Sequence, residues 1–173
     1  METKLNKVVL SVDTGFKNIG HAIVGSDSMN QIHLVDYGVW DMRSEHKKMN
    51  IRSYHGMKRV YKLICELDRR YNFGYICVEN VPFARFNGRD ATLALTNMFR
   101  AYAIVHDKEY SELHSTTVKK ALAGHGRAEK SEVQKSIVDR FERLPDDLAP
   151  DIYDAIGVGV VSLEKEDKFW EFV

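Results

Sequence analysis

The chain has 173 residues, 44% of them hydrophobic and 29% charged, which is the composition of a soluble globular protein with material for one core. Its formal net charge is zero, so any nucleic-acid partner must be held by local basic patches. The apolar run at 8–12 is too short for a signal segment or a membrane span. Cys65 and Cys77 form no Cys-x-x-Cys pair, so we expect two buried thiols in a reducing, cytoplasmic setting. The length and the absence of a linker-like segment predict a single domain over 1–173.

The apolar pattern predicts alternating strands and helices. Short runs typical of strands lie at 8–12, 20–24, 32–39, 75–78 and 112–114. Helical spacing of apolar residues predicts helices at 49–71, 91–106, 117–123, 130–143 and 151–163. Gly157 and Gly159 in the last helix indicate a close backbone approach to a neighbouring element. Three early strands followed by alternating helices and strands predict an α/β fold with a mixed sheet flanked by helices.

Four acidic residues occupy unusual positions. Asp13 and Glu79 each end an apolar strand, where open α/β sheets place their ligands. Asp151 and Asp154 are three residues apart at the start of an apolar helix and therefore share a face. A charge beside a core strand is unfavourable unless it is paired, and no lysine or arginine adjoins Asp13 or Glu79 in the sequence.

We hypothesise that the four acids converge on divalent cations. An all-oxygen ligand set suits Mg²⁺ or Mn²⁺ and not zinc. Two such ions about 4 Å apart can activate a water molecule and stabilise the leaving oxygen of a phosphodiester. Structural explanations exist for each acid alone: Asp13 could cap a turn, Glu79 could pair with a distant arginine, and the two helical aspartates could stabilise the helix dipole. The four together, two of them closing apolar strands, favour a site.

Three stretches of the sequence carry a further pattern. The segment 11–20 places Asp-x-Gly after a strand with a glycine further on, and 76–81 carries Glu79 at the end of a strand. The segment 118–134 contains the spacing Gly124-x-Gly126-x-Ala128-x-Lys130, which is the most specific of the three. With the closing acid pair at 151–154, these segments resemble the RuvC-type Holliday junction resolvases in the same order, over about residues 7–162.

The resemblance implies an RNase H-like fold with a mixed sheet of about five strands. It implies catalysis with two Mg²⁺ ions per site, for which Mn²⁺ substitutes, and a symmetric homodimer acting on four-way DNA junctions. Lys119 and Lys130 resemble the family's basic residues near the scissile phosphate, although Lys130 alone would be read as a solvated residue at a helix start. The implied metal-binding catalytic acids are Asp13, Glu79, Asp151 and Asp154.

The loop after Glu79 departs from the family pattern. The family carries an aromatic residue there that reaches toward the junction centre, and here the loop 81–90 is a few residues longer. Phe83 or Phe86 could be the equivalent, with Arg85 as a phosphate contact, since exposed aromatic side chains stack on or wedge between bases. They could also pack under the loop. The altered loop leaves open a broader branched-DNA or flap nuclease of the same fold.

Two helical segments are rich in basic residues. Segment 43–70 has nine basic and three acidic residues, and segment 117–143 has seven and four. Such faces are candidate phosphate contacts, and they also occur as ordinary solvated surface. Helix 91–106 is more apolar than one core-facing stripe requires, so we expect it either to form the dimer face or to be deeply buried; its apolar residues are Leu93, Leu95, Met98, Phe99 and Tyr102.

The triplet Asp13-Thr14-Gly15 also fits two other protein classes. It matches the aspartic protease signature, but that fold is nearly all β, whereas this chain has several helical stretches. Actin-like ATPases and sugar kinases use Asp-x-Gly too, but they need two related subdomains and a second such motif. Inhibition by pepstatin rather than EDTA would identify a protease, and a melting temperature that responds to ATP would identify an ATPase. The sequence favours a metal-dependent nuclease of branched DNA.

Overall fold

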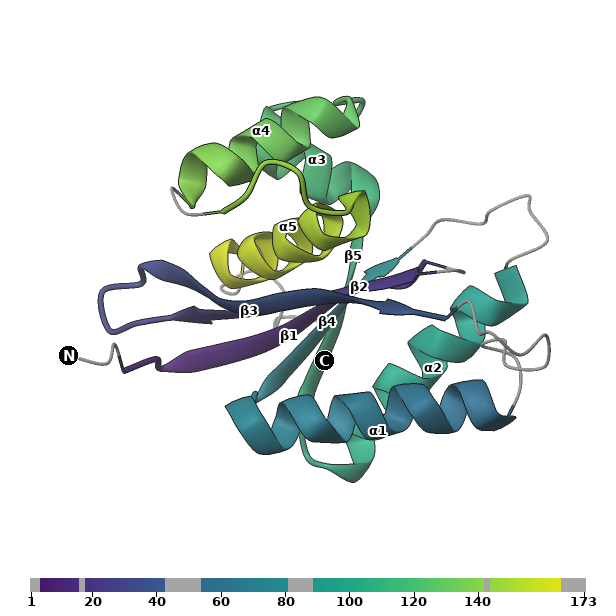
Figure 1. Cartoon of the computed structure of the whole chain (residues 1–173). Helices are drawn as coiled ribbons and strands as arrows, with labels where there is room; N and C mark the ends of the chain where they lie inside the picture. The colour runs from purple at the N-terminus through teal and green to yellow at the C-terminus, as the bar shows by residue number, and fades with distance from the viewer. Residues whose placement is uncertain (1–3, 16–17, 43–53, 81–88, 142–143, 166–173) are drawn as a thin grey trace.

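The structure is a computed structural model that describes residues 4–15, 18–42, 54–80, 89–141 and 144–165. Strands and helices follow one another in the order that the apolar pattern predicts (Figure 1). The strands are β1 (Lys7–Asp13), β2 (Asn18–Ser26), β3 (Ile32–Asp41), β4 (Tyr75–Asn80) and β5 (Glu109–His114). The helices are α1 (Tyr54–Tyr71), α2 (Arg89–Val105), α3 (Ser115–Ala123), α4 (Lys130–Arg140) and α5 (Pro150–Glu164).

The five strands form one mixed sheet in the order β3-β2-β1-β4-β5. The first three strands pair antiparallel as a meander, and β4 and β5 run parallel to β1. Alternation along β1 sends Leu10 and Val12 to one face and Ser11 and Asp13 to the other. The acid that ends β1 therefore lies on the face opposite the larger apolar core.

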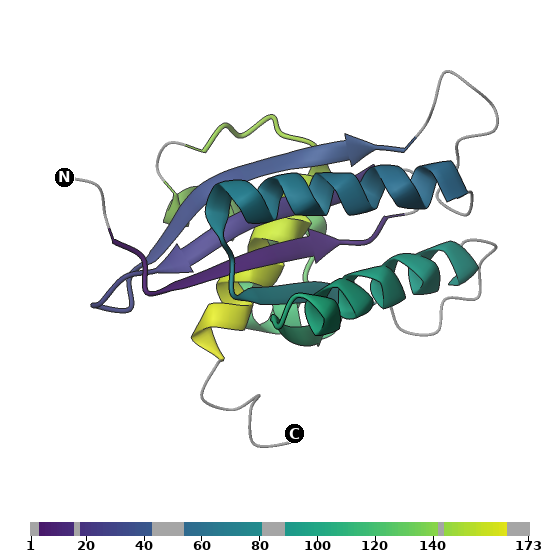
Figure 2. The same ribbon diagram turned by 90° about the horizontal axis from the view of Figure 1, so that it is seen from below.

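Helices cover both faces of the sheet (Figures 1 and 2). On one face, α1 contributes Val60 and Ile64 and α2 contributes Leu95 and Phe99 to the core with β1 and β4. On the other face, α5 packs mainly on β2 and β1, with α3 and α4 outside it. No helix of the described residues is long and apolar enough to cross a membrane.

Two glycines let α5 lie directly against the sheet. A Cβ atom added at Gly159 would come within 2.6 Å of Ser11 Oγ and of Val24 Cγ2. A Cβ at Gly20 in β2 would come within 1.9 Å of the backbone oxygen of Asp151. The close approach predicted for the last helix is confirmed, and Gly20 determines where the first turn of α5 sits on β2.

The structure corrects some boundaries and burial expectations. The second and fifth strands are longer than predicted, the fourth helix ends at Arg140, and part of the predicted helix 49–71 lies outside the described residues. Tyr61 in α1 is 41% exposed, and Cys65, which the sequence predicts to be buried, is only partly buried, whereas Cys77 is fully buried. Both thiols are free, and burial raises the pKa of Cys77 to about 12.

A buried histidine lies on the α1 face of β2. The His21 ring stacks on Trp40 with 4.5 Å between ring centroids, and the absence of a side chain at Gly38 leaves room for it. His21 is 7% exposed, and its Nδ1 has no hydrogen-bond partner among the described residues. Burial lowers the pKa of His21 to about 4, although Asp36 opposes the shift. The folded protein therefore holds this ring neutral.

Acid should destabilise the protein through His21. Between pH 6.5 and about 4 the unfolded ring binds a proton and the folded ring does not, so the free energy of unfolding falls as pH falls through this window. The loss approaches about 3 kcal/mol at pH 4, at ~1.4 kcal/mol per pH unit. Urea unfolding of wild type and of His21→Leu, a substitution of similar volume, should give a difference in stability that changes with pH only over this window. Parallel pH curves would contradict it.

Candidate active site

The two acids at the strand ends lie next to each other. Strands β1 and β4 are parallel neighbours, and Val12 is paired with Val78. The next residues, Asp13 and Glu79, therefore lie side by side. Strand alternation turns both toward the face that α5 covers. Asp13 is 8% exposed and shares a hydrogen bond with Glu79. The structure thus places two of the four acids that the sequence singles out beside each other.

The first turns of α5 bring the other two acids to the same place. Pro150 begins the helix, where its missing N–H needs no partner. Asp151 accepts a hydrogen bond from Asn18 Nδ2 (3.3 Å to Oδ2), and Asp154 accepts one from Lys130 Nζ (2.9 Å to Oδ2). The charges of Asp151 and Asp154 both act on Asp13. Four carboxylates from β1, β4 and α5 thus form one acidic cluster.

Burial and mutual repulsion control the protonation of this cluster. Burial, followed by the charges of Glu79 and Asp154, raises the pKa of Asp13 to about 8. Burial and the Asp154 charge also raise the pKa of Glu79, while the bond from Asp13 and the charge of Lys130 oppose that shift. Asp13 is therefore the protonated partner that donates to Glu79. Positive charge placed among these acids would favour the loss of that proton.

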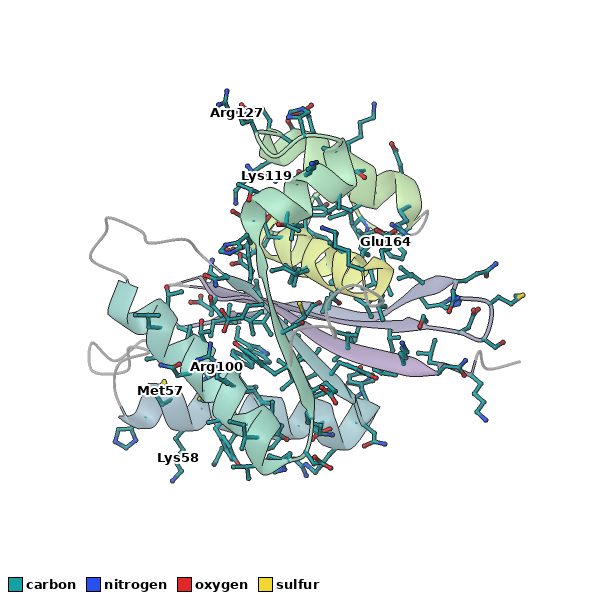
Figure 3. All side chains as sticks on the ribbon, turned by 180° about the vertical axis from the view of Figure 1, so that it is seen from behind. Met57, Lys58, Arg100, Lys119, Arg127 and Glu164 are labelled. Carbon is teal, nitrogen blue, oxygen red and sulfur yellow. The ribbon has the colours of Figure 1, made fainter. Side chains whose placement is uncertain are left out.

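The two predicted lysines have different positions. Lys130 is the first residue of α4, and its side chain is 68% exposed; its bond to Asp154 raises its pKa. Lys119 of α3 donates instead to the backbone oxygen of Ala128 at 2.8 Å, and so ties α3 to the turn that precedes α4. Its charge still lowers the pKa of Glu79. Figure 3 shows Lys119 and Arg127 on the side of the sheet that carries α5.

The acids gather as a cluster and not as a preformed coordination shell. Within the described part of the chain, no group of three or more His, Cys, Asp or Glu side chains is arranged to hold a metal ion. Asp151 turns to Asn18 and Asp154 turns to Lys130, which separates the like charges. The chemistry of the donors nevertheless fits Mg²⁺ or Mn²⁺, since all are carboxylate oxygens and a divalent cation would offset the repulsion that protonates Asp13.

Two positioning residues were not singled out from the sequence. Asn18, the first residue of β2, contacts Asp151, and Gly20 admits the backbone of Asp151. Thr14 Oγ1 and Asn18 Oδ1 beside them are buried without a hydrogen-bond partner among the described residues. Only the glycine in segment 11–20 gave a signal. The predicted DNA contacts Phe83, Arg85 and Phe86 lie outside the described residues.

Residues 9–162 match a protein family described as crossover junction endodeoxyribonuclease RuvC. The chain belongs to the RuvC family. This confirms the resemblance predicted from the Asp-x-Gly, glutamate and Gly-x-Gly-x-Ala-x-Lys segments. Asp13-Thr14-Gly15 is thus the first-strand motif of a RuvC protein and not the signature of an aspartic protease or of an actin-like ATPase.

Individual RuvC proteins match over nearly their whole length. RuvC from Alkaliphilus metalliredigens is 28% identical over 159 residues, covering 88% of this chain and 90% of that protein. The Thermus thermophilus RuvC structure superposes with a TM-score of 0.78 at 19% identity, covering 92% of this chain and 95% of that one. The T. thermophilus RuvC structure in complex with Holliday junction substrate also gives a TM-score of 0.78, at 16% identity and 94% and 96% coverage. The RNase H-like fold predicted from the sequence is confirmed.

Proposed function

We propose that this chain is a Mg²⁺-dependent endodeoxyribonuclease that cuts four-way DNA junctions. The observation that carries the proposal is the buried pair Asp13–Glu79, facing Asp151 and Asp154 in a chain of the RuvC family. Carboxylates so close together repel unless a proton or a cation lies among them. Family membership favours the four-way junction over the broader flap-nuclease alternative.

Asp13, Glu79 and Asp154 are the proposed metal ligands, and Asp151 is a fourth ligand or orients the attacking water. Two bound Mg²⁺ or Mn²⁺ ions would activate that water and stabilise the leaving oxygen of the phosphodiester. The Lys130 side chain is largely exposed and bonds to Asp154 in the cluster. Its ammonium group can therefore give up this bond and bind a phosphate oxygen of the DNA instead. There it would stabilise the negative charge that develops on the phosphate.

Branched DNA is the proposed partner. A solved T. thermophilus RuvC structure holds Holliday junction substrate, which supports the same substrate here. Lys119 and Lys130 lie on the side of the sheet that carries the acids, where a phosphate backbone would pass. Phe83, Phe86 and Arg85 in the loop after β4 remain proposed contacts to the junction.

A homodimer would give the enzyme one active site for each cut strand. Helix α2 remains the proposed dimer face, but the side chains proposed to form it differ from those that the sequence suggests. Leu95, Phe99 and Tyr102 are buried in the chain's own core, whereas Leu93, Ile104 and Val105 are 48%, 75% and 74% exposed. The last three are the proposed interface side chains. Sedimentation of a monomer at micromolar concentration would contradict the dimer.

Cleavage of synthetic substrates tests the proposed function. The experiment compares a four-way junction, a flap and a linear duplex in Mg²⁺, with Asp13→Asn as the inactive control. We expect paired, symmetric nicks in the junction, none in the duplex and none with the variant. Equal cutting of flaps and junctions would instead indicate the broader branch nuclease, and cutting that persists in EDTA would refute the metal-dependent mechanism.

Metal removal should loosen the region that carries the aspartates of α5. Without cations, Asp151 and Asp154 lie beside the carboxyl groups of Asp13 and Glu79, and Asn18 and Lys130 are their hydrogen-bond partners among the described residues. We expect EDTA to accelerate amide hydrogen exchange at 145–155 by about tenfold, corresponding to ~1.4 kcal/mol of local stability. Amides in the middle of α1 serve as the internal control. Unchanged exchange at 145–155 would argue against metal binding by α5.

A further inference from the structure

A second polar cluster lies on the face of the sheet opposite the four acids, and it is centred on Glu112 of β5. The Glu112 carboxylate accepts hydrogen bonds from the Arg100 guanidinium of α2, from Tyr110 Oη at 2.8 Å and from Asn80 Nδ2 at 2.9 Å. Figure 3 shows Arg100 on the far side of the sheet from Lys119. Three elements, α2, β4 and β5, thus meet at one carboxylate.

The members of this cluster hold one another in place. The Glu112 side chain is 19% exposed, so water screens its contacts only partly. Arg100 also lies over the Tyr110 ring, 5.5 Å from its centroid. Burial and the bond to Glu112 raise the pKa of Tyr110, which keeps its hydroxyl protonated as a donor. An ion pair with Arg100, a cation–π contact between Arg100 and Tyr110, and a hydrogen bond from the uncharged Tyr110 hydroxyl therefore fix the carboxylate that Asn80 binds.

Asn80 connects this cluster to the active site. It is the last residue of β4 and follows Glu79 directly, so the two side chains point to opposite faces of the sheet. Strand β5 borders β4 in parallel, with Glu79 paired to Leu113 and Asn80 to His114. The side-chain bond to Glu112 holds the final residue of β4, one residue after Glu79, from the side of the sheet opposite the four acids.

We propose that Glu112, clamped by Arg100 and Tyr110, positions Glu79 by holding Asn80. The effect on catalysis rests on the proposed function, while the effect on the orientation of Glu79 does not. Side chains that ligate metals are commonly oriented by such outer contacts, and their loss typically lowers activity about 10–100-fold. Here the outer contact reaches Glu79 through the backbone of the strand, from the other side of the sheet.

The test uses Asn80→Ala, which removes the donor to Glu112 and leaves both charges of the clamp in place. The two readouts are the single-turnover rate of junction cleavage in Mg²⁺ and the carbon-13 resonance of the Glu79 carboxyl group. We expect the rate to fall about tenfold with unchanged junction affinity, and the resonance to move. The matched control is His33→Ala, which removes an equally long 2.9 Å contact to the Asp27 carboxylate at the far end of the sheet. It should leave both readouts unchanged.

A second variant tests the clamp if Asn80→Ala fails to fold. Tyr110→Phe removes one donor to Glu112 and keeps the ring beneath Arg100. It should move the Glu79 resonance in the same direction by a smaller amount. The double variant should behave like Asn80→Ala alone, because Tyr110 acts only through Glu112 and Asn80. Additive effects of the two substitutions would overturn the network.

The two readouts separate the proposals. A Glu79 resonance that stays in place in Asn80→Ala overturns the positioning role, whatever the cleavage rate. If the wild-type protein cuts no junction, the proposed function fails, and the resonance still decides the role of Asn80. A slower cut with a displaced resonance and an unchanged melting temperature supports the positioning role, since a merely structural contact would lower the melting temperature instead.

Discussion

Replacing Asp13 by asparagine should abolish cleavage and make the protein more stable. The variant loses a proposed metal ligand at the centre of the acidic cluster, so we expect the rate of junction cleavage to fall on the order of 10³-fold or more. The same substitution removes a buried acid whose ionisation the fold opposes. Asparagine has the shape of the protonated carboxyl group and never ionises, so the folded variant avoids that unfavourable charge.

The stabilisation should depend on pH in a defined direction. The pKa of Asp13 is about 8 in the folded protein and 3.8 in an unfolded chain, so the folded state binds the Asp13 proton more tightly. In the wild-type protein, the contribution of this proton to the free energy of unfolding is complete below pH 3.8 and is lost as pH rises to 8. The advantage of Asp13→Asn should therefore grow between pH 4 and pH 8, by up to about 1.4 kcal/mol per pH unit. Melting curves in EDTA at pH 5 and pH 8 measure it. An advantage that shrinks toward pH 8 would show that Asp13 is ionised in the folded protein.

Adding one methyl group at Gly20 should damage both fold and activity. The new Cβ would lie 1.9 Å from the backbone oxygen of Asp151, so either β2 or the first turn of α5 must move. We expect Gly20→Ala to cost about 1–3 kcal/mol of stability from overpacking. Displacing Asp151 and Asp154 by about 1 Å should slow cleavage roughly 10²-fold.

Gly74→Ala is the matched control for this substitution. A Cβ at Gly74 would meet nothing within 4 Å, and the position lies between α1 and β4, away from the acids. Its melting temperature and cleavage rate should stay near the wild-type values. If Gly20→Ala behaved in the same way, the contact between β2 and α5 would not determine the position of the aspartates.

The sequence predicts the acids well because their signals are local. Asp13 and Glu79 interrupt apolar strands, and strand alternation then determines the face on which each lies. The spacing of Asp151 and Asp154 places both on one side of a helix. Each inference needs only the periodicity of a single element. The mixed sheet of about five strands followed from the resemblance to the RuvC family, whereas the order of its strands comes from the structure.

Contacts between distant elements could not be predicted in this way. The bonds from Asn18 to Asp151 and from Lys119 to Ala128 depend on how one element crosses another. The proposed dimer face of α2 shows the same limit. The apolar residues of this helix lie on more than one of its faces. Periodicity alone does not distinguish those that enter the core, such as Phe99, from those that remain exposed, such as Ile104.

The close seat of α5 on the sheet has a consequence for sequence variation. The helix touches β2 at Gly20 and packs on Ser11 and Val24 through Gly159, and at both points only a hydrogen atom fits. A library that randomises both positions should therefore return glycine at each, whether survivors are chosen for folding or for junction cutting. At Asp13 the two selections should diverge, because folding alone would favour asparagine there.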